Sequence, residues 1–140
     1  MMQSAAVMVA RVTGKDVENW RGAVLMLERA FEPGMADETF AMLEEDLYAE
    51  RSLLWVAHVR GEGYGAAATK VVCYPNGRKV CVITACAGHS FKTWRQALQE
   101  IEKYAKAMDC AAVRLSGRRG WKILKSEGYR EPWIMLEKEL

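Results

Sequence analysis

The pattern of apolar and polar residues predicts several strands in this chain. Four segments have apolar patterns typical of strands: Ser4–Val12, Leu53–Arg60, Tyr64–Tyr74 and Lys79–Ala87. Gly61-Glu62-Gly63 and Pro75-Asn76-Gly77 separate the last three, and Gly and Asn tolerate the positive φ that tight turns need. The sequence therefore predicts a first strand and, later in the chain, an antiparallel meander of three strands.

Two helices are predicted between the first strand and the meander. After Thr13, which has the spacing of a capping box with Asp16, apolar residues recur at steps of three and four: Val17, Trp20, Val24, Leu27 and Phe31. Pro33-Gly34 would end this helix. Asp37 is the predicted N-cap of a second helix, which would carry three apolar residues inward: Phe40, Leu43 and Leu47.

The second half of the chain predicts a strand, helix and strand unit. The run Phe91–Met108 has one apolar stripe, made of Trp94, Leu98, Ile101, Ala105 and Met108. A strand at Ala111–Ser116 follows it at once. A crossover helix brings the two strands that it joins into parallel alignment, so Ala111–Ser116 should lie parallel to the strand before the helix.

The remaining segments complete the predicted order of elements. A basic turn and a short helix are expected within Gly117–Tyr129, and Trp133–Glu137 is expected to form a last strand. The full order is β-α-α-β-β-β-α-β-α-β. This order predicts a single α/β (α+β) domain over residues 1–140, with a mixed twisted sheet of about six to seven strands.

Composition places the chain among globular proteins. It has 140 residues, 51% of them hydrophobic and 27% charged, which suits one domain with one substantial core. A net charge of +2 is too small to predict a nucleic-acid partner, and no apolar run is long enough to cross a membrane. The four cysteines form no Cys-x-x-Cys pair, so buried thiols in a reducing cytoplasm are expected.

The order of elements and several motifs resemble the GCN5-related N-acetyltransferase (GNAT) superfamily. The most specific pieces are Trp94–Asp109, the strand that follows it, and Glu127-Gly128-Tyr129 after the last helix. A narrower set of motifs resembles GNAT-like proteins of bacteriophages and prophages: Tyr74-Pro75, Arg78–Cys81, Trp94, Ile101-Glu102 and Gly117–Trp121. That narrower resemblance implies a protein of the host cytoplasm that is also a candidate component of a virion.

The resemblance implies a pyrophosphate-binding loop after the strand Lys79–Ala87. In the superfamily this loop carries Arg/Gln-x-x-Gly-x-Gly/Ala, and acetyl-CoA places its charge at the N-terminus of the next helix. The corresponding residues here include a single glycine: Gly88, His89, Ser90, Phe91, Lys92, Thr93 and Trp94. The bulky Phe91 and Trp94 are expected to obstruct the approach of the pyrophosphate. If acetyl-CoA does bind, the predicted contacts are Gly88, His89, Ser90, Lys92 and Thr93.

Catalytic groups are difficult to find in the sequence. Leu124 stands where many relatives have a tyrosine that protonates the leaving thiolate, and Val80–Cys86 contains no Asp, Glu or His. Cys86 and His89 lie three positions apart and are weak candidates for a thiolate and its base. A buried cysteine beside a surface histidine is the alternative interpretation. No metal site is predicted.

A basic cluster follows the last strand of the strand, helix and strand unit. Arg118, Arg119, Lys122 and Lys125 surround a turn and a predicted helix start, where a phosphate, a nucleic-acid backbone or a protein partner could bind. A solvated surface is the alternative.

Two hypotheses for function remain from the sequence. The first is a GNAT-fold protein that needs no cofactor and serves as a structural or interaction component of a phage particle or its assembly. Its partners would be other protein subunits, with nucleic acid a weaker candidate and no membrane. The second is an acyl-CoA-dependent N-acyltransferase that binds acetyl-CoA through an atypical loop.

Overall fold

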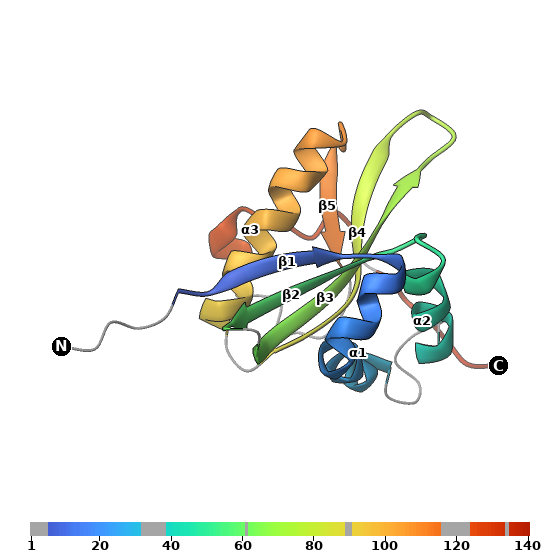
Figure 1. Ribbon diagram of the computed structural model, residues 1–140. Coiled ribbons are helices and arrows are strands. Elements are labelled where there is room, and N and C mark those ends of the chain that lie inside the picture. Colours follow the sequence, from blue (N-terminus) through green and yellow to red (C-terminus); the bar gives the residue numbers. More distant parts are fainter. Residues whose placement is uncertain (1–5, 32–38, 61, 89–90, 116–123, 134) are drawn as a thin grey trace.

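The computed structural model describes residues 6–31, 39–60, 62–88, 91–115, 124–133 and 135–140. Five strands form one sheet in the order β1-β2-β3-β4-β5 (Figure 1). Their bounds are β1 (Met8–Val12), β2 (Leu53–Val59), β3 (Glu62–Cys73), β4 (Lys79–Gly88) and β5 (Ala112–Leu115). Neighbouring strands are antiparallel except β4 and β5, which are parallel as the sequence predicts.

The two hairpin turns of the meander differ in how well the sequence predicts them. Gly77 has a φ of 85°, and its N–H donates to the carbonyl of Tyr74 at 2.9 Å, so the predicted turn at Pro75-Asn76-Gly77 is confirmed. The first turn is tighter than predicted. Val59 pairs with Glu62, and only residues 60 and 61 connect the strands. The predicted turn at Gly61-Glu62-Gly63 is therefore wrong, because Glu62 and Gly63 already belong to β3.

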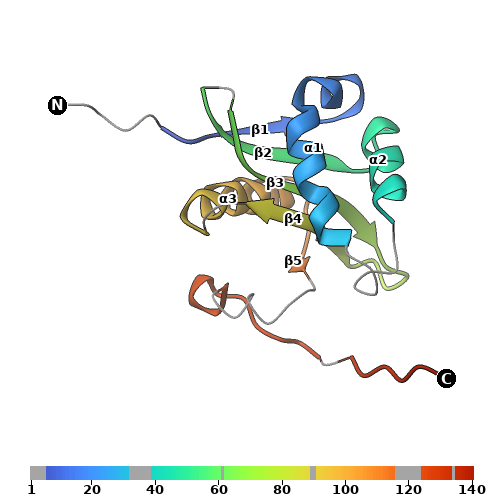
Figure 2. The same ribbon diagram turned by 90° about the horizontal axis from the view of Figure 1, so that it is seen from below.

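One face of the sheet is covered by the helices that follow β1 (Figure 2). These are the 3₁₀ helix Gly14–Trp20, α1 (Arg21–Leu27), the 3₁₀ helix Glu28–Phe31 and α2 (Phe40–Tyr48). Their buried residues meet inward-facing aliphatic side chains of β2 and β3: Val17, Val24, Leu27, Leu43, Leu47, Leu54, Val56, Ala66 and Ala68. The N-cap of α2 is Thr39 and not the predicted Asp37, because the Thr39 side chain accepts a hydrogen bond from the Met42 N–H at 3.2 Å.

The opposite face of the sheet is covered by α3 (Phe91–Ala107). Alternate strand residues supply this second core, which contains Trp55, Ala67, Cys81, Ile83, Trp94, Leu98, Ile101, Ala105 and Leu124. Four members of the predicted apolar stripe are therefore buried. The fifth, Met108, lies beyond the end of α3 with 39% of its surface exposed. The helix ends one residue earlier than predicted, which leaves Met108 off the stripe.

The end of the chain departs from the sequence prediction. A 3₁₀ turn occupies residues 124–127, in the segment expected to be a short helix. Residues 131–133 and 135–140 form no strand, so the predicted strand Trp133–Glu137 is wrong, with Ile134 outside the described residues. Trp133 instead packs its ring over the guanidinium of Arg114, with 4.6 Å between the carbon CZ and the ring centroid. The described sheet consequently has five strands, fewer than the six or seven predicted.

Candidate functional site

The candidate site is the opening between β4 and β5. The two strands pair over four residues, from Val80 beside Ala112 to Ile83 beside Leu115. Beyond Ile83, no strand within the described part of the chain pairs with that side of β4. The last five residues of β4, Thr84–Gly88, therefore have a neighbour only on the β3 side. Peptide groups along an unpaired strand edge are free to bind an extended ligand.

A bulge in β4 marks the start of this opening. Ala85 pairs with Ala68 and Ile83 pairs with Thr69, which leaves Thr84 as the extra residue. The Thr84 hydroxyl donates to the carbonyl of Ala68 at 3.2 Å. Such a bulge bends the strand and shifts its side-chain alternation by one position. As a result, Cys86 packs on the same core as Ile83, although three positions separate them.

The N-terminus of α3 lies directly after this part of β4. The helix begins at Phe91, three positions after Gly88, and the first four N–H groups of a helix have no partner within it. Together with the helix dipole, these groups favour a bound anion. Trp94 has 5% of its surface exposed and packs in the α3 core beside Leu98. The prediction that Trp94 obstructs a pyrophosphate is therefore wrong, because its ring points into the protein.

The residues predicted to hold acetyl-CoA are only partly described. Gly88 is the exposed last residue of β4, where the open edge meets α3. Lys92 and Thr93 belong to the first turn of α3, but their side chains lie outside the described residues. His89 and Ser90 lie outside them entirely. The structure thus places Gly88, Lys92 and Thr93 around one strand-to-helix junction, and their contacts with a ligand stay predictions.

Cys86 lies on the unpaired half of β4. Its side chain is half-buried in the α3 core, and this burial raises the pKa of the thiol to about 12. A thiol with that pKa remains protonated near neutral pH, which disfavours a nucleophilic role. The pairing of Cys86 with His89 stays a prediction, because His89 lies outside the described residues.

A segment after the 3₁₀ turn is fastened to α3 by contacts that the sequence analysis missed. Tyr129 donates a hydrogen bond to a Glu102 carboxylate oxygen at 2.8 Å, and Arg95 forms an ion pair with Glu127 at 2.8 Å. Burial, then the hydrogen bond to Glu102, raises the pKa of Tyr129 well above its usual value, so the phenol stays a donor. Their motifs were visible in the sequence, but nothing in their spacing showed that they meet.

Leu124 occupies the position where relatives carry a catalytic tyrosine. Its side chain has 1% of its surface exposed and belongs to the α3 core. It is therefore a packing residue in this chain and offers no proton to a leaving group.

The basic cluster is described only at its end. Lys125 is exposed, with its Nζ 4.0 Å from a carboxylate oxygen of Glu131. Arg118, Arg119 and Lys122 lie outside the described residues, so their binding to phosphate or to a partner stays a prediction. Arg114, which the sequence places next to this cluster, is used inside the fold. It donates to the Tyr74 hydroxyl at 2.7 Å.

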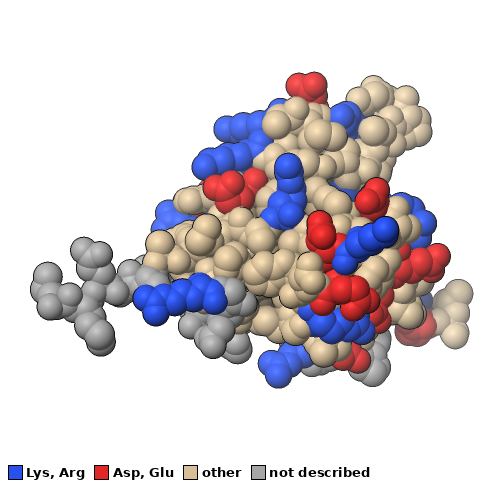
Figure 3. Space-filling model, viewed as in Figure 1, with Lys and Arg blue, Asp and Glu red and all other residues tan. Residues whose placement is uncertain are grey.

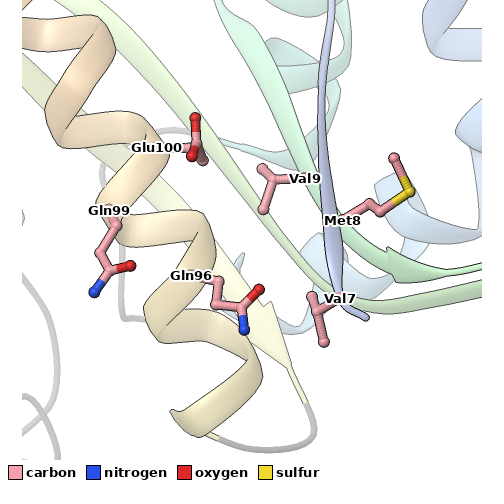
Figure 4. A pocket seen from close by; sticks show the side chains of 6 residues that line it. All are labelled: Val7, Met8, Val9, Gln96, Gln99 and Glu100. Carbon is pink, nitrogen blue, oxygen red and sulfur yellow. The ribbon is translucent and has the colours of Figure 1, made fainter. Parts of the chain in front are cut away.

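Other surface features do not converge on a second reactive site. A hollow of about 410 Å³ lies between β1 and α3, and Figure 4 shows its lining side chains: Val7, Met8, Val9, Gln96, Gln99 and Glu100. Positive and negative side chains are interspersed on the face seen in Figure 3. The acidic side chains of α2 are partly neutralised within the chain, since Arg21 pairs with Glu44 and Arg51 with Asp46.

Two further searches gave negative results for the part of the chain that the structure describes. No group of three or more His, Cys, Asp or Glu side chains there could hold a metal ion. No helix in the same residues has the length and apolar character to cross a membrane.

Comparison with solved structures identifies the architecture. An aminoglycoside acetyltransferase from an uncultured soil metagenomic sample, in complex with trehalose, has a TM-score of 0.73 at 11% identity, with 96% of each chain covered. An aminoglycoside N-acetyltransferase in complex with CoA has a TM-score of 0.70 at 17% identity, covering 99% of this chain and 98% of the other. The chain has the GNAT fold. No family model and no curated protein matches the sequence.

A third GNAT structure shows the same coverage. Ribosomal-protein-alanine N-acetyltransferase from Brucella melitensis biovar Abortus 2308 has a TM-score of 0.72 at 13% identity, covering 96% of this chain and all of the other. The predicted fold class is thereby confirmed. The narrower resemblance to phage and prophage proteins, and the virion role that depends on it, stay predictions.

Proposed function

We propose that the protein is an acyl-CoA-dependent N-acyltransferase that binds its acyl donor in the opening between β4 and β5. The observation that carries this proposal is the half-paired β4. Its first half pairs with β5, while Thr84–Gly88 runs unpaired on that side toward the N-terminus of α3. The fold supports the proposal, because the three compared structures are all described as acetyltransferases.

The peptide groups of Thr84–Gly88 would bind the extended, amide-containing part of the acyl donor as a neighbouring strand would. The free N–H groups at the start of α3 would bind its phosphates. Both elements use the backbone, so neither requires the glycines that the sequence lacks at Phe91 and Thr93. Because Trp94 points into the core, its bulk does not oppose this arrangement.

The chemistry can proceed without a dedicated acid. A neutral amine attacks the thioester carbonyl, a C–N bond forms, and the C–S bond breaks to release a thiolate. A thiol has a pKa of about 8.5, so the released thiolate is a stable anion that water can protonate. The buried Leu124 in place of a tyrosine therefore predicts a slower enzyme and does not predict an inactive one.

A non-catalytic role for the same fold is the second candidate, and one observation favours it. Tyr129 donates to Glu102, Cys86 is a protonated thiol and Leu124 is buried, so these three side chains supply no acid or base to the opening. In that case the protein would bind CoA without turnover, or would not bind it at all.

Thermal unfolding with and without acetyl-CoA tests binding, and release of free thiol in the presence of amines tests transfer. A ligand that binds only the folded state at about 100 times its Kd stabilises the protein by about 2.7 kcal/mol. We expect a clear rise in Tm with acetyl-CoA and slow release of thiol when amines are added. Binding without thiol release would favour the non-catalytic role, and the absence of a Tm shift would contradict the proposal.

A matched pair of substitutions at Gly88 locates the site. Gly88 is exposed, and its φ is outside the left-handed region, so both Gly88→Glu and Gly88→Gln should fold. Glutamate places a negative charge beside the proposed phosphate position, where repulsion of about 1 kcal/mol in water weakens binding by about fivefold. Glutamine has the same shape without the charge. Equal loss of binding in both variants would show that the charge is not close to the phosphates.

A further inference from the structure

The C-terminal arm, residues 131–140, exposes a run of apolar side chains. Trp133 is 57% exposed, Met135 82% and Leu136 91%. Together with residue 134, they form the apolar run for which the sequence predicts a strand. Consecutive exposed apolar residues of this size are uncommon on a monomer and usually mark a contact with another molecule.

The outer edge of β5 is also without a partner strand in the described residues. β5 is the last strand in the sheet order, and its inner edge pairs with β4. Figure 2 shows the arm passing beyond this edge and continuing away from the sheet. An exposed strand edge readily accepts a strand from another chain.

We propose that the protein forms a dimer in which each copy's C-terminal arm adds a strand to the β5 edge of the other copy. A twofold axis makes the exchange reciprocal, so one symmetric interface pairs both edges and covers both apolar runs. The lengths agree, because β5 has four residues and the apolar run of the arm, residues 133–136, also has four.

The occupant is the arm of a second copy and not the arm of the same chain. Tyr129 is held to Glu102 on α3, and Trp133 packs over the Arg114 side chain. These two contacts fix the start of the arm, and the residues after Trp133 then lead away from their own β5 edge (Figure 2). Met135 and Leu136 consequently lie where only another molecule can cover them.

Analytical ultracentrifugation of the full chain tests the proposal directly. We expect a particle of about twice the 15.8 kDa chain mass at micromolar concentration. The double variant Met135→Glu, Leu136→Glu should sediment as a monomer, because charges at these positions cannot be buried against an apolar edge. Both side chains are exposed, so the variant should retain the secondary structure of the parent.

The matched control is Lys138→Glu. This substitution changes the net charge by the same two units as the double variant but leaves the apolar run intact, so the dimer should persist. A synthetic peptide of residues 130–140, added in excess, should convert the parent dimer into peptide-bound monomers. The same peptide carrying both glutamates should have no effect.

Three results would overturn the proposal. One is a parent protein that remains monomeric at every concentration, and another is a dimer that the double variant leaves intact. The third is a monomer whose arm is protected from amide hydrogen exchange, because that result would place the arm on its own β5 edge.

Discussion

The two halves of β4 differ in their neighbours far more than in their sequence. Residues 79–83 pair with β3 on one side and with β5 on the other, whereas residues 84–88 pair with β3 alone. Apart from Lys79 and Thr84, both halves consist of small or apolar residues. The candidate site therefore depends on where strand pairing stops. It does not depend on a cluster of reactive side chains.

Three local features separate the halves. The bulge at Thr84 bends β4, β5 ends at Leu115 beside Ile83, and α3 begins shortly after Gly88. A parallel partner that ended two residues later would cover the opening. The paired half is consequently a scaffold, and the unpaired half is available for a ligand.

Truncation of the scaffold half should have the largest effect. Ile83 is buried in the α3 core with its strand paired on both sides, so Ile83→Ala should lower the free energy of unfolding by about 2 to 5 kcal/mol. Cys86→Ala in the unpaired half is the matched control, because it removes a single half-buried sulfur atom and should cost about 1 kcal/mol. Urea unfolding of both variants measures the difference. Equal losses would show that the two halves are not energetically distinct.

The fastening of the 124–129 segment to α3 should have the next largest effect. Tyr129→Phe removes the hydroxyl that donates to Glu102 and leaves a half-buried carboxylate without that donor, which costs about 1 to 3 kcal/mol. The comparison variant is Tyr48→Phe, which removes a similar hydrogen bond to Glu18 on an exposed surface. A smaller change in Tm is expected there, since water replaces the lost partner. If Tyr129→Phe changed stability no more than Tyr48→Phe, the segment would not be fastened as described.

The bulge at the boundary between the halves should contribute less. Thr84→Val keeps the shape of the side chain and removes its hydrogen bond to the Ala68 carbonyl, so the expected loss is about 0.5 to 1.5 kcal/mol. If the bulge shapes the opening, acetyl-CoA affinity should fall further than this stability loss explains. Isothermal titration calorimetry at a temperature well below Tm separates the two effects. Unchanged affinity would show that the bulge is structural only.

Local patterns predicted the scaffold well and the site poorly. The α3 stripe could be predicted because Trp94, Leu98 and Ile101 recur at helical spacing, and the same pattern buries them. That burial also explains why Trp94 does not obstruct the site, a conclusion that treating it as a loop residue missed. Pairing between β4 and β5 could not be read from the sequence, because where parallel pairing stops depends on tertiary packing. The arm failed for a similar reason, since an apolar run at Trp133–Leu136 predicts a strand whether or not an edge is available.

The smallest effect concerns the reactivity of Cys86. Burial raises its pKa from 9.0 to about 12, so at pH 8 only about one thiol in ten thousand is ionised. We expect a thiol reagent to modify the exposed Cys73 much faster than Cys86, and labelling of Cys86 to accelerate as the pH rises. Mass spectrometry of digested protein measures both rates in one sample.

The raised pKa of Cys86 also has a consequence for stability. The folded state holds the thiol proton more tightly than the unfolded state, so this stabilising contribution is complete below about pH 9 and is lost as the pH rises toward 12. Cys86→Ala should remove the part of the pH dependence that Cys86 supplies, while Cys73→Ala should leave it unchanged. Rapid labelling of Cys86 at pH 8 would contradict this account. It would show that the unpaired half of β4 opens to solvent and would restore Cys86 as a candidate nucleophile.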